Sequence, residues 1–247
     1  MSADKIQSNT ILGKWTEEKL DTLLRQSWSI DDIGGRIDFL SARFTYSKYS
    51  DGTLIGDAAT PEVFVINLKE IDCFTYLDYV EAMTLSRSFA EFRENLRNVR
   101  YRSGILSFEN RNHFFTDWRE VNADIVEDVT ASLAGERGIQ IEKTLNVKED
   151  GTHFLNGIPP VKRQLTYIPS RILNDGLMEK LKTGDFVGIY SEEQGLDVSH
   201  VGIITIEDNI RYLRHASSAE EYRKVIDQDL KDYLLNKPGI IVLRPKE

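Results

Sequence analysis

Several features that commonly reveal a protein's class are scarce or missing in this chain of 247 residues. It contains one cysteine, so neither an internal disulfide nor a cysteine-cluster metal site can form. No apolar run approaches the roughly 18 residues that a membrane helix needs. The N-terminal stretch MSADKIQSNT also lacks the apolar core of a signal peptide. We therefore expect no membrane span, and either a cytosolic chain or one whose export signal has been removed.

Positive charge is also in short supply. Lysine and arginine number 31 against 40 aspartates and glutamates, which gives a formal net charge of −9. Long-range attraction to nucleic acid or to an anionic membrane is therefore not expected. A local cluster of Arg97, Arg100 and Arg102 could hold a carboxylate, but a solvated helix face is the favoured interpretation.

The remaining composition is that of a folded globular protein. Hydrophobic residues make up 40% and charged residues 29%, which supplies enough apolar material for a sizeable core. The length exceeds the typical domain of about 150 residues, yet one α+β domain with insertions can occupy it. We expect a single domain over residues 1–247, with an N-terminal helical segment at 1–40.

Periodicity and turn signals predict the elements of this domain. Helices are expected at 16–26, 30–43, 74–86 and 89–99, a long loop at 46–62, a strand at 63–68, and short strands and loops over 130–165. The last third predicts antiparallel strands at 185–190, 201–206 and 210–215, a helix at 224–236 and a final strand at 239–244. The fold class is therefore α+β with a central antiparallel sheet.

The single cysteine, Cys73, lies where a helix is predicted to begin. Asp72 is well placed as the N-cap, so Cys73 falls in the first turn. A helix N-terminus favours the thiolate and so lowers the pKa of a thiol, which makes Cys73 a candidate nucleophile. The alternative is a small, inert, buried side chain.

Histidine is rare, and two of the four histidines lie on neighbouring predicted strands. His200 and His215 are 215 − 200 = 15 positions apart, a spacing that can bring them together across a hairpin. His200 could then take the proton of the thiol while His215 orients its ring. Two alternatives are histidines that satisfy sheet hydrogen bonds and a metal-binding pair. Metal is the weaker alternative, because no carboxylate is obviously aimed at the pair.

Several longer motifs resemble known families. The segments LKTGDFVGIY, SHVGIIT and RYLRHASS, with the DC pair that opens a helix, resemble the papain-like NlpC/P60 cysteine peptidases. From about residue 40 to the end, the chain is similar to the DUF1460 family, described as N-acetylmuramoyl-L-alanine amidase-like. The matching stretches are TLIGDAATPEVFVINLKEIDCFTYLDYVEA, VRYRSGILSFENRNHFFTDW, LDVSHVGI, LRHASS and GIIVLRP.

The resemblance implies a fold in which a nucleophile helix packs on the central antiparallel sheet. It also implies Cys73 as nucleophile, His200 as general base and His215 as the orienting third residue, with no cofactor and no metal. The separation of nucleophile and base, 200 − 73 = 127 residues, is longer than in compact NlpC/P60 domains. We interpret residues 87–180 as a family-specific insertion that walls the cleft.

Three further residues are candidates for substrate or oxyanion binding. Tyr49 matches a family tyrosine beside the nucleophile, although Lys48 replaces the usual preceding proline, and the alternative is an exposed loop tyrosine. Asp72 could contact a substrate amine or only cap the helix. His113 could line the cleft or satisfy a hydrogen bond in the core.

The function implied by the resemblance is cysteine-dependent amide hydrolysis in peptidoglycan through a thioester, at the bond between N-acetylmuramic acid and L-alanine. Alternatives are an endopeptidase that cuts between D-glutamate and the diamino acid of stem peptides, and a non-catalytic module that binds the cell wall. The expected partner is peptidoglycan or a muropeptide, and the expected state is a monomer. The expected location is the periplasm or cell envelope if an export signal has been removed, and the cytoplasm if the chain is native full length.

Overall fold

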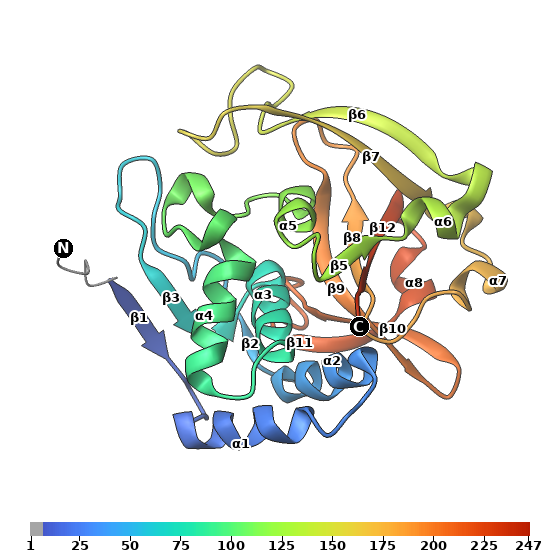
Figure 1. Ribbon diagram of the computed structural model, residues 1–247. Coiled ribbons are helices and arrows are strands. Elements are labelled where there is room, and N and C mark those ends of the chain that lie inside the picture. The colour runs from blue at the N-terminus through green and yellow to red at the C-terminus, as the bar shows by residue number, and fades with distance from the viewer. Residues whose placement is uncertain (1–6) are drawn as a thin grey trace.

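One large antiparallel sheet organises the computed structural model, which describes residues 7–247 (Figure 1). Its strands lie in the order β11-β10-β9-β8-β12-β7-β6, and β5 also pairs with β12. They are β5 (Val126–Asp128), β6 (Ile139–Leu145), β7 (Val161–Pro169), β8 (Phe186–Tyr190), β9 (Val198–Glu207), β10 (Ile210–Ala216), β11 (Val225–Asp229) and β12 (Gly239–Pro245). Although β12 is last in sequence, it lies between β8 and β7 and so joins the two halves of the sheet.

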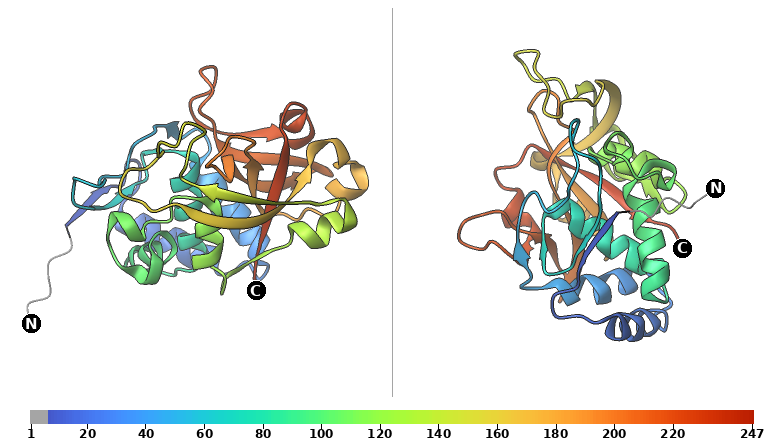
Figure 2. Two further views of the ribbon diagram at one scale, coloured as in Figure 1. Left: turned by 90° about the horizontal axis from the view of Figure 1, so that it is seen from above. Right: turned by 90° about the vertical axis from the view of Figure 1, so that its left-hand side faces the viewer.

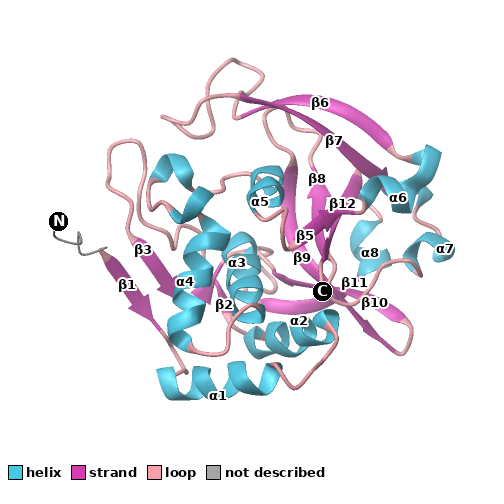
Figure 3. Ribbon diagram, viewed as in Figure 1, coloured by secondary structure: helices cyan, strands magenta, loops and turns pink. Residues whose placement is uncertain are grey.

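Helices cover both faces of this sheet, as Figure 3 shows. They are α1 (Glu17–Ser27), α2 (Ile33–Ser41), α3 (Cys73–Thr84), α4 (Phe89–Arg100), α5 (Phe115–Val121), α6 (Thr130–Ala134), α7 (Asp175–Met178) and α8 (Leu230–Leu234). Two small parallel sheets flank the helices: β1 (Ser8–Ile11) with β3 (Phe64–Asn67), and β2 (Lys48–Tyr49) with β4 (Glu70–Ile71).

The two faces of the sheet belong to two separate apolar clusters. Alternate residues of the central strands point to opposite faces, so Ile241 packs with helices α1–α5 while Val242 packs with α6–α8. Strands buried on both faces need apolar residues at nearly every position. This requirement explains the continuous runs FVGIY in β8 and GIIVL in β12, which are buried throughout.

A buried ion pair ties α3 to its neighbouring helices. Arg100 of α4 donates from Nε to Asp78 Oδ2 at 2.7 Å and from Nη1 to the carbonyl of Val65 at 2.7 Å. The other oxygen of Asp78 accepts from Trp118 Nε1 of α5 at 3.1 Å. The prediction that Arg100 lies on a solvated helix face is therefore wrong, because its side chain is 1% exposed and bound to a carboxylate within the core.

Most predicted elements are present, and two segments differ from their prediction. The predicted helix at 224–236 is instead strand β11 followed by the short helix α8. The segment 130–165 holds α6 and a long hairpin, β6–β7, instead of short strands; Figure 2 shows this hairpin in yellow-green and gold. Residues 46–62 form the predicted loop, apart from the two-residue strand β2.

The predicted N-terminal helical segment contains β1, α1 and α2, and its residues 1–6 lie outside the described part of the chain. The stretch MSADKIQSNT, which lacks the apolar core of a signal peptide, also lies partly outside the described residues. Within residues 7–247, no helix is both long enough and apolar enough to cross a membrane.

Candidate active site

Cys73 is the first residue of α3, and its neighbour Asp72 explains why the helix begins there. Asp72 Oδ1 accepts from the backbone N–H groups of Phe74 at 2.9 Å and Thr75 at 2.7 Å. In return, Thr75 Oγ1 accepts from the N–H of Asp72 at 3.1 Å, which completes a capping box. One oxygen of the Asp72 carboxylate, Oδ1, is therefore occupied in capping the helix.

Three adjacent strands carry a chain of hydrogen-bonded side chains beside this helix. His200 of β9 bonds through Nε2 to His215 Nδ1 of β10 at 2.7 Å, with the two rings almost perpendicular at 89°. His215 bonds in turn through Nε2 to Gln228 Oε1 of β11 at 2.7 Å. The structure thus brings together the two predicted histidines and adds Gln228, which we call with them the imidazole relay.

Gly202 leaves the space that the two histidine rings of the relay occupy. The hairpin register pairs Arg214 with Ile203, so the next residue, His215, lies opposite Gly202 and diagonal to His200. A Cβ atom at Gly202 would come within 3.0 Å of the Cβ of His215. The absent side chain lets the two rings meet on one face of the sheet.

Aromatic side chains flank Cys73 and the relay. Tyr49 of β2 pairs with Ile71 of β4, two residues before Cys73, and the guanidinium of Arg223 lies 4.6 Å from its ring centre. Burial, with the nearby Cys73 and Asp72, raises the pKa of Tyr49 to about 12. On the relay, the ring of Tyr233 from α8 packs at 6.3 Å from His200 and 5.2 Å from His215.

A mainly apolar cavity of about 220 Å³ opens between Cys73 and His200. Its walls come from the start of α3, the segment before and within α5, the β6–β7 loop and the start of β9. They comprise Cys73, Phe74, His113, Phe114, Phe115, Phe154, Leu155, Leu196, Asp197, Val198, Ser199, His200 and Val201. No lysine or arginine is among these lining residues. Five of them, from His113 to Leu155, belong to the predicted insertion at 87–180.

Two roles were considered for His113, lining the cleft and making an internal hydrogen bond, and the structure shows both. It lines the cavity, and its Nε2 lies 2.7 Å from the carbonyl oxygen of Phe108. Its ring also packs edge-on against Phe108, and burial lowers its pKa. We therefore regard His113 as a neutral wall residue held by its own loop.

Burial keeps the thiol of Cys73 and the two imidazoles of the relay uncharged. It raises the pKa of Cys73 to about 12, and Asp72 adds to the effect, while backbone N–H groups of Val201, Cys73 and Phe74 lower that pKa less strongly. Burial likewise lowers the pKa of His200 to about 3 and of His215 to about 4. The expectation of an acidic thiol is therefore wrong: the helix N-terminus lowers the pKa of Cys73, but desolvation of the sulfur raises it more.

Within residues 7–247, no group of three or more His, Cys, Asp or Glu side chains is placed to hold a metal ion. Three of the four ring nitrogens of His200 and His215 are already engaged in the relay.

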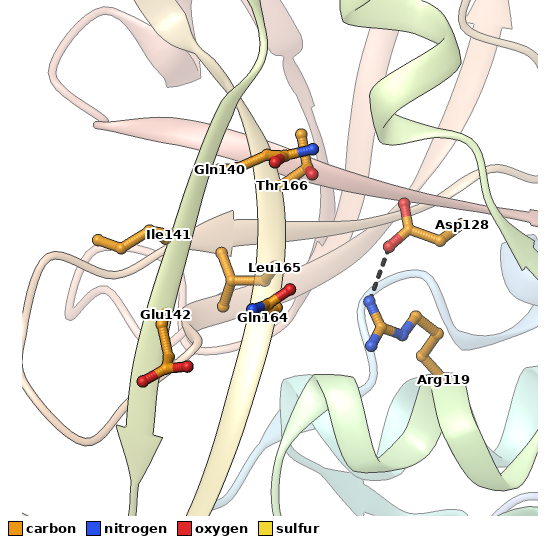
Figure 4. Close-up of a pocket in the computed structure, with 8 residues that line it drawn as sticks. All are labelled: Arg119, Asp128, Gln140, Ile141, Glu142, Gln164, Leu165 and Thr166. Carbon is orange, nitrogen blue, oxygen red and sulfur yellow. Dashed lines mark hydrogen bonds and ion pairs between the residues drawn. The ribbon is translucent and has the colours of Figure 1, made fainter.

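A second cavity, of about 410 Å³, lies between the β6–β7 hairpin and α5 (Figure 4). Gln140, Gln164 and Thr166 line it, together with the ion pair between Arg119 and Asp128 at 2.9 Å. It contains no cysteine, histidine or serine and shares no residue with the cavity at Cys73. It therefore lacks the residue types of the candidate site at Cys73.

Comparison with protein families gives a match over most of the chain. The family model described as AmiA-like, N-acetylmuramoyl-L-alanine amidase-like, matches residues 39–240, which include every residue of the relay and Cys73. The chain belongs to this amidase-like family. A comparison with curated proteins gave no match.

Several solved structures share the fold. A DUF1460 protein from Legionella pneumophila superposes with a TM-score of 0.79 at 24% identity, over 94% of each chain. An N-acetylmuramoyl-L-alanine amidase from Bacteroides uniformis gives a TM-score of 0.71 at 29% identity, over 87% of this chain and 99% of the other. A putative xylanase from Bacteroides fragilis gives 0.67 at 28% identity, over 83% and 98%.

Proposed function

We propose that this protein is a cysteine-dependent amide hydrolase of peptidoglycan that cuts the bond between N-acetylmuramic acid and L-alanine, on a papain-like fold of the NlpC/P60 type. The observation that carries the proposal is the shared cavity of Cys73 and His200, with His200 hydrogen-bonded to His215 behind it. A nucleophile, a base and an orienting group in this order are the requirements for acyl transfer.

The neutral site suits general-base catalysis. As the sulfur of Cys73 bonds to the amide carbon, the thiol proton passes to Nδ1 of His200, the ring nitrogen outside the relay. The carbonyl oxygen takes the negative charge, for which we assign the backbone N–H of Cys73 and the hydroxyl of Tyr49 as donors. Tyr49 keeps its proton at neutral pH because its pKa is about 12.

Collapse of this intermediate breaks the C–N bond, and the proton on His200 goes to the leaving amine. The product is a thioester on Cys73. Water then attacks the thioester while His200 accepts its proton, and cleavage of the C–S bond returns the proton to the thiol. No group outside the chain and water is required for this cycle.

The chemistry of the cavity supports the amidase over the endopeptidase. In the amidase reaction, the acyl group transferred to Cys73 is the uncharged lactyl group of N-acetylmuramic acid. In the endopeptidase reaction, it is a D-glutamyl group that carries a free carboxylate. The cavity beside Cys73 is mainly apolar and has no lysine or arginine among its lining residues. The naming of the Bacteroides uniformis relatives as N-acetylmuramoyl-L-alanine amidases supports the same bond. We further propose a monomer that acts in the cell envelope.

The decisive test is incubation of purified peptidoglycan with the wild-type protein and with Cys73→Ala, followed by mass spectrometry of the soluble fragments. We expect the wild type to release intact stem peptides that begin with L-alanine, and Cys73→Ala to release none. L-alanyl-D-glutamate left on the sugar would instead identify the endopeptidase. Equal cleavage by both proteins, or binding without cleavage by the wild type, would refute the cysteine hydrolase.

A further inference from the structure

The last member of the relay is a neutral amide where acyl-transfer sites often have a carboxylate. Gln228 presents its oxygen to His215 at 2.7 Å, and an amide oxygen can only accept a hydrogen bond. Its chain neighbour Asp227 does carry a carboxylate. That carboxylate is bound by Arg214 through two hydrogen bonds of 2.7 and 2.9 Å.

This acceptor determines which ring nitrogen of each histidine in the relay carries the hydrogen. Because Gln228 Oε1 accepts, His215 must carry its hydrogen on Nε2, which leaves its Nδ1 as an acceptor when the ring is neutral. His200 must then donate from its own Nε2 to that Nδ1. The remaining nitrogen of His200, Nδ1, is left with a free lone pair.

We propose that Gln228 is a positioning residue that fixes the tautomers of His215 and His200, and thereby keeps Nδ1 of His200 free to accept the proton of Cys73. The inference rests on the proposed function of Cys73 and His200, and it adds the residue that sets the protonation pattern behind them. A donor at position 228, or no partner there, would let both rings reverse their tautomers and place a hydrogen on Nδ1 of His200.

The charges around the relay explain why a neutral amide suits it. The cationic Lys237, just beyond α8, disfavours protonation of both rings, while Asp227 favours protonation of His215. Further titratable groups nearby are Cys73 at the start of α3, its N-cap Asp72, and Tyr233 on α8. Gln228 fixes orientation without adding a second negative charge, which would favour an imidazolium that cannot act as a base.

Two variants separate the roles of shape, acceptor and charge. Gln228→Met keeps the length of the side chain and removes the acceptor, and Gln228→Glu keeps an acceptor and adds charge. The matched control is Gln140→Met, the same replacement at an exposed site on β6. Because Cys73 is the only thiol, its alkylation by iodoacetamide reports this site alone and needs no peptidoglycan.

We expect Gln228→Met to slow both alkylation of Cys73 at neutral pH and amide hydrolysis by about 10-fold to 100-fold, the usual size of an orienting effect. For hydrolysis, kcat should decrease while KM stays unchanged. Gln228→Glu should retain activity at alkaline pH, with the acidic limb of both pH profiles moved upward by about 1 to 3 pH units. Gln140→Met should match the wild type.

Imidazole ¹⁵N NMR measures the tautomers of His200 and His215 directly. These tautomers would not change if Gln228 contributed only to packing. In the wild type at pH 8, we expect both His200 and His215 to carry hydrogen only on Nε2, and Gln228→Met to show mixed tautomers. An unchanged tautomer pattern and unchanged alkylation in Gln228→Met would overturn the inference, and so would equal losses in both variants. Absence of hydrolysis by the wild type, with the NMR and alkylation results as expected, would refute the proposed function alone.

Discussion

Helix α3 contacts two polar sites, one partly buried and one fully buried, that differ in how their hydrogen bonds are satisfied. At its start, the imidazole relay and the Asp72 cap have a hydrogen-bond partner at each step. Eight residues later Glu81 is fully buried, and neither carboxylate oxygen has a partner. Burial raises the pKa of Glu81 to about 8. One helix therefore holds a hydrogen-bonded polar site at its start and, further along, an acid that is costly to ionise.

Breaking the relay in the middle is expected to have the largest effect on activity. His215→Ala removes the group that orients His200, so kcat should fall on the order of 10²-fold to 10⁴-fold with KM little changed. Some activity should remain, since His215 does not receive the proton of the thiol. Steady-state hydrolysis of a muropeptide measures this, with the exposed His153→Ala as control. A loss as complete as that of Cys73→Ala would assign His215 a direct part in the chemistry.

The buried ion pair between Asp78 and Arg100 shows how much a paired buried charge on the same helix contributes to stability. Arg100→Met leaves Asp78 uncompensated, and we expect the free energy of unfolding to fall by about 3–5 kcal/mol. Lys48→Met breaks an exposed ion pair with Glu70 and should lower the free energy of unfolding far less, because water screens that pair. Urea denaturation at pH 7 measures both. Similar small losses in the two variants would mean that the buried pair adds no more than a surface pair.

Glu81 should make the protein less stable in base. Its pKa rises from 4.5 to about 8 on folding, so the unfolded chain loses its proton first, and stability falls as pH rises from 4.5 towards 8. The fall between pH 5 and pH 8 should be about 3 kcal/mol. Glu81→Gln should abolish it, and the exposed Glu94→Gln should not. A wild type and Glu81→Gln with the same pH dependence would show that Glu81 reaches water.

His215 should have the opposite dependence, with a smaller effect than Glu81. The pKa of His215 falls from 6.5 to about 4 on folding, so its contribution is present above pH 6.5 and is lost as pH falls towards 4. Between pH 7 and pH 5 the loss should be about 2 kcal/mol. His215→Gln should reduce the acid sensitivity of unfolding by that amount, whereas His153→Gln should leave it unchanged. Equal acid sensitivity in His215→Gln and the wild type would contradict a neutral, buried imidazole.

The sequence predicted the parts of the site that depend on local patterns. Asp72 as N-cap predicted a helix with Cys73 in its first turn, and consecutive antiparallel strands around a tight turn placed His200 and His215 together. The AmiA-like family match confirmed the amidase resemblance.

Features that depend on distant partners were missed. Gln228 was overlooked because 224–236 was interpreted as one helix, although Val225 and Ile226 favour a strand and Asp229 caps the short helix that follows. Arg100 looked solvated because nothing near it in sequence identifies Asp78 as its partner. The thiol looked acidic because the helix start is local, whereas the burial that raises the pKa of Cys73 comes from the surrounding fold.

The position of β12 has a consequence for the order of folding. Strands β7 and β8 are neighbours of β12 in the sheet, so neither is paired on that side until the latest strand in sequence inserts between them. Such long-range pairing slows folding, and unpaired strand edges favour association between chains. During synthesis on the ribosome, we therefore expect the nascent chain to need protection of these two edges until residues 239–245 have emerged.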